Sequence, residues 1–274
     1  MVRSTHPDDK IKKLDVKWFN CNEWLMLKNE DYGKAEIWKR QVYNIQHDAA
    51  QALSEAHARL NSKDSDYNEI IRIDNQIVID PKVIESAFYL RYCILLLQGC
   101  GDKLAQMIRC ALGITQWLKE KDGEATEDNT TLKKLPGRLG LLIKCPTLPN
   151  QEKVRYQKIR EDLEAYLADE SVICILEYAN AIKHRWQLFY QGEGLQPPKP
   201  EIIVRKDKGG KIIREFPIGT SVFGEDINKH IDLCLETNNM FVDIANAILN
   251  HLDANRFYTD KNGKKILEIG VIKR

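Results

Sequence analysis

The chain has 274 residues, of which 43% are hydrophobic and 30% are charged. This composition is typical of a soluble globular protein and excludes an intrinsically disordered chain. With 41 basic and 40 acidic residues the charges nearly cancel, so net charge gives no support for general nucleic-acid binding, although it still allows a local basic patch.

The cysteines and the apolar runs indicate in which cellular compartment the protein is found. The seven cysteines are odd in number and no two have CxxC spacing, so we expect free, mostly buried thiols, no metal and no cofactor. Residues 1–18 lack the apolar stretch of a signal peptide. The longest apolar run, residues 92–97, is far shorter than the roughly 20 residues that span a bilayer. We therefore expect a cytoplasmic protein with no membrane partner.

The first predicted elements are an arm, a long helix and a pair of strands. We assign residues 1–30 to an N-terminal arm that packs onto the body of the protein. Apolar residues that include Ile37 and Val42 recur at three to five residue intervals and predict a helix over 32–60. Residues 70–80 are expected to form a short strand pair or an extended arm.

A second helix is predicted over 81–120, with its apolar centre in the middle of the core. Gly99 and Gly101 lie within it and would allow a close helix approach, a bend or a break. Asp102 and Lys103 follow directly. Either the helix breaks at the glycines and Asp102 caps the next turn, or Asp102 makes a polar contact across the protein to the polar helix face described below.

Two further helical segments follow a polar loop. A shorter helix is predicted over 132–143, with an interruption near Pro136. The clearest helical pattern covers 151–190, and it divides near the sequence ADES if Asp169 or Ser171 caps a new start.

The last part of the chain combines strands with one more helix. Residues 201–217 form two β-rich arms around a Lys-Gly-Gly turn, which is a hairpin pattern. A final helix is predicted over 225–253, and a β-rich tail over 256–274 contains a second small hairpin. The sum is a mainly α protein: a bundle of four to five long helices with one or two small β-hairpins, in which 31–255 form a single helical domain with a hairpin insert at about 201–217.

One short stretch of the 151–190 segment contains several polar and charged side chains close together. The sequence EYANAIKHRW puts Asn180 and His184 four residues apart, on one helix face, with Glu177 one turn earlier. Lys183 and Arg185 flank the histidine. This face lies beside the apolar stripe of the helix, so its polar groups would be partly shielded from solvent.

These residues also carry a family resemblance. The order of the elements over roughly 82–252 resembles the HEPN superfamily of prokaryotic helical bundles, in which a late core helix carries an Arg-Asn pair followed, after three residues, by His. The sequence ANAIKHR supplies Asn180 and His184 at the matching positions. It departs from the pattern at Ala179, which stands where the family has arginine.

The resemblance implies a fold, an activity and partners. Active members cleave RNA without a metal: the 2′-hydroxyl attacks the adjacent phosphate, the histidine transfers a proton and the arginine stabilises the phosphorane charge. It also implies a defence or stress role, as in toxin–antitoxin systems of the bacterial cytoplasm, and a homodimer whose two polar faces share one RNA-binding groove.

Two interpretations of the function follow, because the motif arginine is missing. In the first, the protein binds RNA and is an endoribonuclease or a degenerate relative, and an arginine at position 179 would restore activity. Its catalytic residues would be His184, Asn180 and Arg185, although Arg185 points about 100° further around the helix. The residues expected to assist binding are Glu177, Lys183, Asp102 and Lys103. In the second, His184 and Asn180 make structural hydrogen bonds, and the protein is a non-catalytic interaction or regulatory module with a protein partner.

Overall fold

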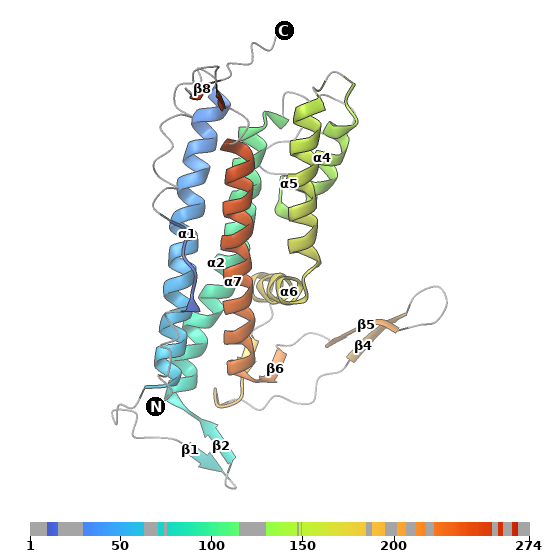
Figure 1. Ribbon diagram of the computed structural model, residues 1–274. Helices are drawn as coiled ribbons and strands as arrows, with labels where there is room; N and C mark the ends of the chain where they lie inside the picture. Colours follow the sequence, from blue (N-terminus) through green and yellow to red (C-terminus); the bar gives the residue numbers. More distant parts are fainter. Residues whose placement is uncertain are drawn as a thin grey trace, which may run out of the picture. The chain divides into compact units, whose positions relative to one another are not determined.

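The computed structural model is mainly helical, as the sequence predicts. Most of the described residues are helical. The α-helices are α1 (Glu30–Leu60), α2 (Pro81–Ala111), α4 (Leu135–Ile143), α5 (Asn150–Ala168), α6 (Glu170–His184) and α7 (Ile227–Asp253), and a 3₁₀ helix, η4 (Leu132–Lys134), precedes α4 (Figure 1). The structure describes residues 10–15, 30–62, 71–73, 76–114, 130–146, 148, 150–184, 188–194, 202–206, 212–217, 222–253, 257–259 and 265–267.

The strands form two-stranded pairs. Three pairs are antiparallel and lie where the sequence predicts them: β1 (Ile71–Ile73) with β2 (Gln76–Ile79), β4 (Ile202–Lys206) with β5 (Ile212–Pro217), and β7 (Phe257–Thr259) with β8 (Lys265–Leu267). The fourth pair is parallel and was not predicted. It joins β3 (Leu188–Tyr190) to β6 (Val222–Glu225).

The chain divides into two compact units. Unit 1 comprises residues 1–11, 48–98 and 173–237, and unit 2 comprises residues 12–47, 99–172 and 238–274. Helices α1, α2 and α7 each contribute residues to both units.

Unit 1 has a core made by four helices. Buried side chains of α1, α2, α6 and α7 pack together there, and Tyr190 of β3 joins them. Ser86 of α2 donates a hydrogen bond of 2.7 Å to the carbonyl oxygen of Ala56, which fixes α2 against α1. The core includes Leu53, Ala56, Leu90, Ile94, Ile175, Ala179, Ile231 and Cys234.

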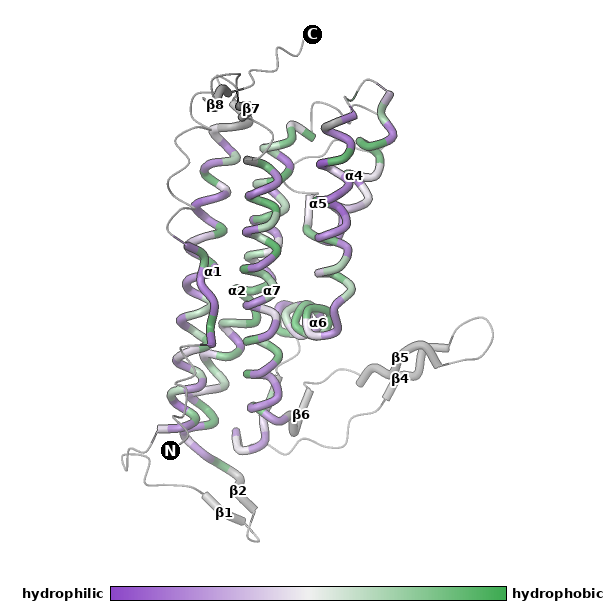
Figure 2. The backbone as a smooth tube through the Cα atoms, in the orientation of Figure 1, coloured by the Kyte–Doolittle hydropathy of each residue, from purple (hydrophilic) through white to green (hydrophobic). Residues whose placement is uncertain are grey.

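Unit 2 has its own buried side chains, contributed by α1, α2, α4, α5 and α7. Tyr166 of α5 meets Phe241 of α7 edge to face, with ring centroids 6.3 Å apart. His251 of α7 also lies 3.1 Å from Asp162 of α5. Figure 2 shows hydrophilic and hydrophobic positions alternating along α1 and α7, as expected of helices that bury one face.

Helix α2 runs unbroken through Gly99 and Gly101, so the predicted break is wrong. The close approach is confirmed at Gly101, where a Cβ atom would lie 2.8 Å from Cδ2 of Leu132. Among the described residues, α2 is also the one helix long and apolar enough to cross a membrane, and 44% of its apolar window is buried. Core helices of soluble proteins meet the same criterion.

The 132–190 region differs from the predicted pattern in two ways. Pro136 does not interrupt a helix; it lies in the first turn of α4, where its missing N–H is harmless. The 151–190 segment divides at ADES, as the sequence allowed, but it is not helical to its end: α6 ends at His184 and β3 follows at Leu188–Tyr190. The predicted cap is confirmed at Asp169, which is the one residue between α5 and α6.

Candidate functional site

The cap at Asp169 sets the start of α6. Its Oδ1 accepts hydrogen bonds from the backbone N–H of Ser171 at 2.9 Å and of Val172 at 3.4 Å, and from the Ser171 hydroxyl at 2.5 Å. These bonds hold the pKa of Asp169 below its ordinary value, against the smaller opposing effect of burial. The helix then buries Val172, Ile175 and Ala179 in succession.

The predicted polar face of α6 is exposed to solvent. Glu177, Asn180 and Lys183 are all exposed. The Asn180 Oδ1 accepts a hydrogen bond of 3.0 Å from Gln98 Nε2 of α2. His184 is the last residue of α6; its side chain and all of Arg185 lie outside the described residues. The structure therefore brings the Asn180 face of α6 to the outer side of α2 within unit 1.

Ala179, at the position of the motif arginine, is fully buried. It belongs to the apolar core of unit 1 together with Leu90, Ile94 and Ile175. A guanidinium at this position would enter a packed apolar interior rather than the solvent-facing side of α6. The expectation that arginine at position 179 would restore activity therefore lacks the open site that it needs.

Asp102 and Lys103 have other partners in unit 2. Asp102 Oδ1 lies 3.5 Å from the backbone N–H of Leu132, the first residue of η4. The Lys103 ammonium lies 4.5 Å from the centre of the Trp38 ring. Neither of the two predicted roles of Asp102 describes this contact, because α2 does not break and the carboxylate faces η4.

The outer side of α2 carries large apolar side chains that the sequence analysis did not single out. Ile84, Phe88 and Tyr92 are four residues apart and so share a helix face, and their exposed fractions are 42%, 66% and 48%. Contiguous exposed apolar side chains of this size are a common mark of an interaction surface. Unit 1 thus has two exposed sets of residues, Ile84, Phe88 and Tyr92 on α2 and Glu177, Asn180 and Lys183 on α6, and the hydrogen bond between Gln98 and Asn180 joins the two helices. We call the two sets together the α2–α6 surface.

An ion pair holds the residues after β3 against α2. Arg91 Nη2 donates to both carboxylate oxygens of Glu193, and Glu193 Oε2 accepts a hydrogen bond of 2.8 Å from the backbone N–H of Tyr190. The carboxylate is mostly buried. Arg91 therefore neutralises a carboxylate inside unit 1 and has a structural role there.

A buried histidine lies next to this ion pair. His230 of α7 has its Nδ1 3.1 Å from the Tyr190 hydroxyl, and its ring centroid is 4.4 Å from that of Tyr178. Burial and the nearby Lys229 lower the pKa of His230 to about 4, although Asp226 opposes them. The imidazole is thus neutral at pH 7.

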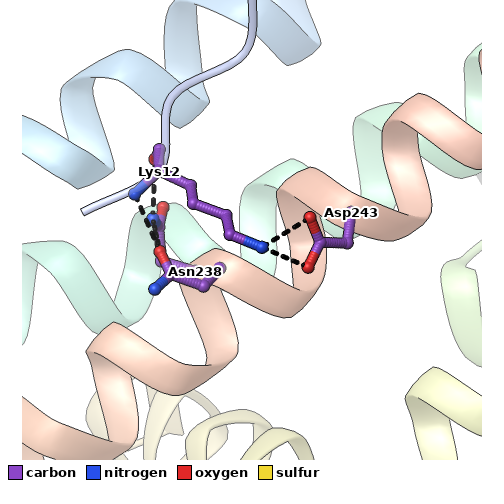
Figure 3. Close-up of polar contacts among 4 residues, drawn as sticks. Lys12, Asn238 and Asp243 are labelled. Carbon is purple, nitrogen blue, oxygen red and sulfur yellow. Dashed lines mark hydrogen bonds and ion pairs between the residues drawn. The ribbon is translucent and has the colours of Figure 1, made fainter. Parts of the chain in front are cut away.

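In unit 2 a second polar site holds the chain around Lys12 (Figure 3), where residues 11–15 belong to no helix or strand. Side-chain amides bind its backbone: Asn239 Oδ1 accepts from Lys12 N at 2.8 Å, and Gln46 Nε2 and Asn238 Nδ2 donate to Lys12 O at 3.1 and 2.9 Å. Gln46 Oε1 also accepts from Leu14 N at 3.0 Å.

Two side chains complete this contact, which we call the amide clamp. The Lys12 ammonium lies 2.8 and 2.6 Å from the two carboxylate oxygens of Asp243, and Leu14 is buried. His47 Nε2 donates to Leu14 O at 3.0 Å. Gln46 Nε2 also donates to Asn238 Oδ1 at 2.9 Å, so an amide of α1 and an amide of α7 hold each other in position.

The clamp is close to energetic balance. Each backbone hydrogen bond adds about 1 kcal/mol, burial of Leu14 adds about 2 kcal/mol, and the exposed Lys12–Asp243 pair adds less than about 1 kcal/mol. Ordering each residue of the segment costs about 1–2 kcal/mol. For four or five ordered residues the gains and costs nearly cancel, so the segment can open without global unfolding.

The described residues offer little support for a metal centre or a large ligand pocket. Among them, no group of three or more His, Cys, Asp and Glu side chains could hold a metal ion. A hollow in unit 1, of about 90 Å³, is too small for a nucleotide and is lined by Lys10, Ile11, Leu53, His57, Ile231, Asp232 and Leu235. The six described cysteines are free thiols, and four of them are buried.

Comparisons with models of protein families, with curated proteins and with solved structures find no match for this chain.

Proposed function

We propose that this protein is a non-catalytic, HEPN-like helical module that self-associates through the α2–α6 surface. The complete burial of Ala179 is the observation that carries the non-catalytic part of the proposal. The HEPN-like relationship itself continues to rest on the order of the helices and on the spacing of Asn180 and His184.

The described cations near α6 do not supply the missing positive charge. The Arg91 guanidinium binds the mostly buried carboxylate of Glu193. Lys183 lies three residues from Asn180, so the two are neighbours on α6, but Lys183 is solvent-exposed, where a charge stabilises a phosphorane far less than in a shielded site. The positions of these two cations therefore count against RNA cleavage.

The α2–α6 surface is better suited to protein than to RNA. It combines apolar side chains with both signs of charge, whereas an RNA surface is expected to be basic. In an antiparallel pair of α6 helices related by a two-fold axis at Asn180, Glu177 lies opposite the partner's Lys183, and the same contact forms twice. This charge pattern favours a second copy of the chain as the partner.

The absence of catalysis can be tested directly. Purified wild type and His184→Ala are incubated with a labelled single-stranded RNA in the presence of a metal chelator, and the products are separated on a gel. We expect the two proteins to leave the RNA equally intact. Metal-independent cleavage by the wild type that His184→Ala reduces by about 100-fold, as loss of a general acid or base would, overturns the proposal.

The self-association requires a separate test with a matched control. Light scattering at micromolar concentration should give a dimer mass for the wild type and a monomer mass for Phe88→Ser. Val154→Ser should remain a dimer, because Val154 is also a mostly exposed apolar residue (61%) but lies on α5. A monomeric wild type that binds single-stranded RNA through Phe88 would replace this proposal with RNA binding by base stacking.

A further inference from the structure

The amide clamp has the construction of a peptide-binding site. Gln46 and Asn238 are fully buried, and buried amides are costly unless their hydrogen bonds are made. Both donate to the same backbone oxygen, that of Lys12, and Gln46 also accepts from the next-but-one backbone N–H. The clamp thus binds main-chain groups, which any extended polypeptide presents.

Two side-chain positions add selectivity to this backbone recognition. Lys12 and Leu14 are two residues apart, so in an extended chain their side chains fall on the same face. Asp243 binds the ammonium of the first, and the second is buried, whereas Lys13 between them is exposed. The clamp therefore selects an extended segment with the pattern Lys-x-Leu, and Figure 3 shows the contact of its lysine with Asp243.

We propose that the amide clamp is an exchangeable peptide-binding site, occupied by residues 12–14 of the same chain or by the same residues of a second copy. The second copy is the partner of choice because it carries the one segment known to match the clamp. Backbone hydrogen bonds, one exposed ion pair and one buried leucine hold the segment, and none of these is covalent. This site lies in unit 2 and does not depend on the α2–α6 surface.

Mixing two full-length variants tests the exchange. The acceptor, Lys12→Asp with Leu14→Asp, keeps the clamp intact but has a segment that no longer fits it. The donor, Asp243→Lys, keeps the segment but weakens its own clamp. Both variants also carry Phe88→Ser, so that association through the α2–α6 surface does not contribute. A donor with the additional change Leu14→Asp is the control.

Native mass spectrometry of equimolar mixtures should show a one-to-one complex of acceptor and donor, and the control mixture should show at least about tenfold less of it. Equal amounts of complex in the two mixtures, or none in either, overturn the proposal.

A second measurement keeps the test decisive if circular dichroism shows that the acceptor does not fold. Asp243 is exposed, so Asp243→Lys should fold, and labelled hexapeptides of residues 10–15 can then be titrated into it. The hexapeptide with Asp at position 12 should bind about tenfold more tightly than the one with Lys, and the wild type should show the reverse order. The same order for both proteins refutes the assigned role of Asp243 and with it the proposal.

Discussion

Ala179 and Asn180 are neighbours on α6, but they should differ strongly in the substitutions that they tolerate. Ala179 is fully buried and Asn180 is exposed, so we predict opposite outcomes for the same new side chain at the two positions. Ala179→Arg should lower the free energy of unfolding by at least about 3 kcal/mol, because it places a charge in an apolar core. Asn180→Arg should lower it by about 1 kcal/mol or less, which is the value of the lost hydrogen bond to Gln98.

Urea unfolding followed by circular dichroism measures both variants. An Ala179→Arg protein that is as stable as Asn180→Arg would contradict the burial of position 179, and it would reopen the question of whether a cation there can face a substrate.

The buried His230 predicts a pH dependence of stability. Its pKa is about 4 in the folded protein and near the ordinary 6.5 when unfolded. Between these values the unfolded chain takes up a proton and the folded chain does not, so stability is present above pH 6.5 and is lost as the pH falls towards 4. From pH 7 to pH 5 this residue should reduce the free energy of unfolding by about 1–2 kcal/mol.

The variant His230→Gln provides the comparison, because glutamine does not titrate in this range. Carboxylates that titrate over the same range are common to both proteins and cancel in the difference. The wild type should therefore lose more stability than His230→Gln between pH 7 and pH 5 in urea unfolding experiments. An equal loss would mean that folding does not lower the pKa of His230.

At the residue scale, the sequence predicted which face of a helix is buried better than it predicted which side chains contact each other. The apolar stripe expected beside the polar face of α6 is present, since Val172, Ile175 and Ala179 recur at helical spacing and are all buried. The same reasoning failed at Ile37, which is 58% exposed although it fits the apolar period of α1. The amide clamp could not be predicted, because Gln46 and Asn238 meet only after α1 and α7 have packed.

At the element scale, alanine substitutions at the two glycines of α2 can be compared directly, because both glycines lie in the same helix but have different neighbours. At Gly99 the nearest atom to a new Cβ would be Ile45 Cγ2 at 3.9 Å, an ordinary contact, so Gly99→Ala should stabilise the protein by about 0.5–1 kcal/mol through helix propensity. At Gly101 the Cβ would lie 2.8 Å from Leu132 Cδ2, and Leu132 is itself buried. Gly101→Ala should therefore be less stable than Gly99→Ala by about 1–3 kcal/mol.

Thermal or urea unfolding of both variants gives this difference. Leu132→Val, which removes the clashing atom, should recover part of the stability of Gly101→Ala. If the two alanine variants are equally stable, η4 does not pack against α2 as closely as described.

Elements that depend on local signals were predicted well. Apolar periodicity located α1 and α7, and the Lys-Gly-Gly turn located the hairpin of β4 and β5. The parallel pair of β3 and β6 was missed, because a long connection separates its strands and leaves no turn pattern to recognise. The glycines of α2 were ambiguous, since a close approach and a break require the same residue type.

At the scale of the whole molecule, the buried thiols can report how the two units unfold. Cys93 and Cys234 are buried in unit 1, and Cys100 and Cys110 in unit 2. Because α1, α2 and α7 run through both units, we predict that all four thiols become reactive together as urea is raised. Mass spectrometry after brief alkylation resolves each site, and Cys145 and Cys174, which are partly exposed, should react first. Two separate transitions would show that the units are independent folding units.

The single residue between α5 and α6 determines where the chain can accept an insertion or a deletion. Since Asp169 begins a new helix with its own hydrogen bonds, the rotational phase of α6 does not depend on that of α5. An extra residue ahead of Asp169 can be absorbed in the turn. One inserted after Val172 would rotate the rest of α6 by about 100°, carry Tyr178 into the core position of Ala179 and move Ala179 to the exposed position of Asn180. Insertions and deletions directly before Asp169 should therefore be tolerated, and those within α6 should not.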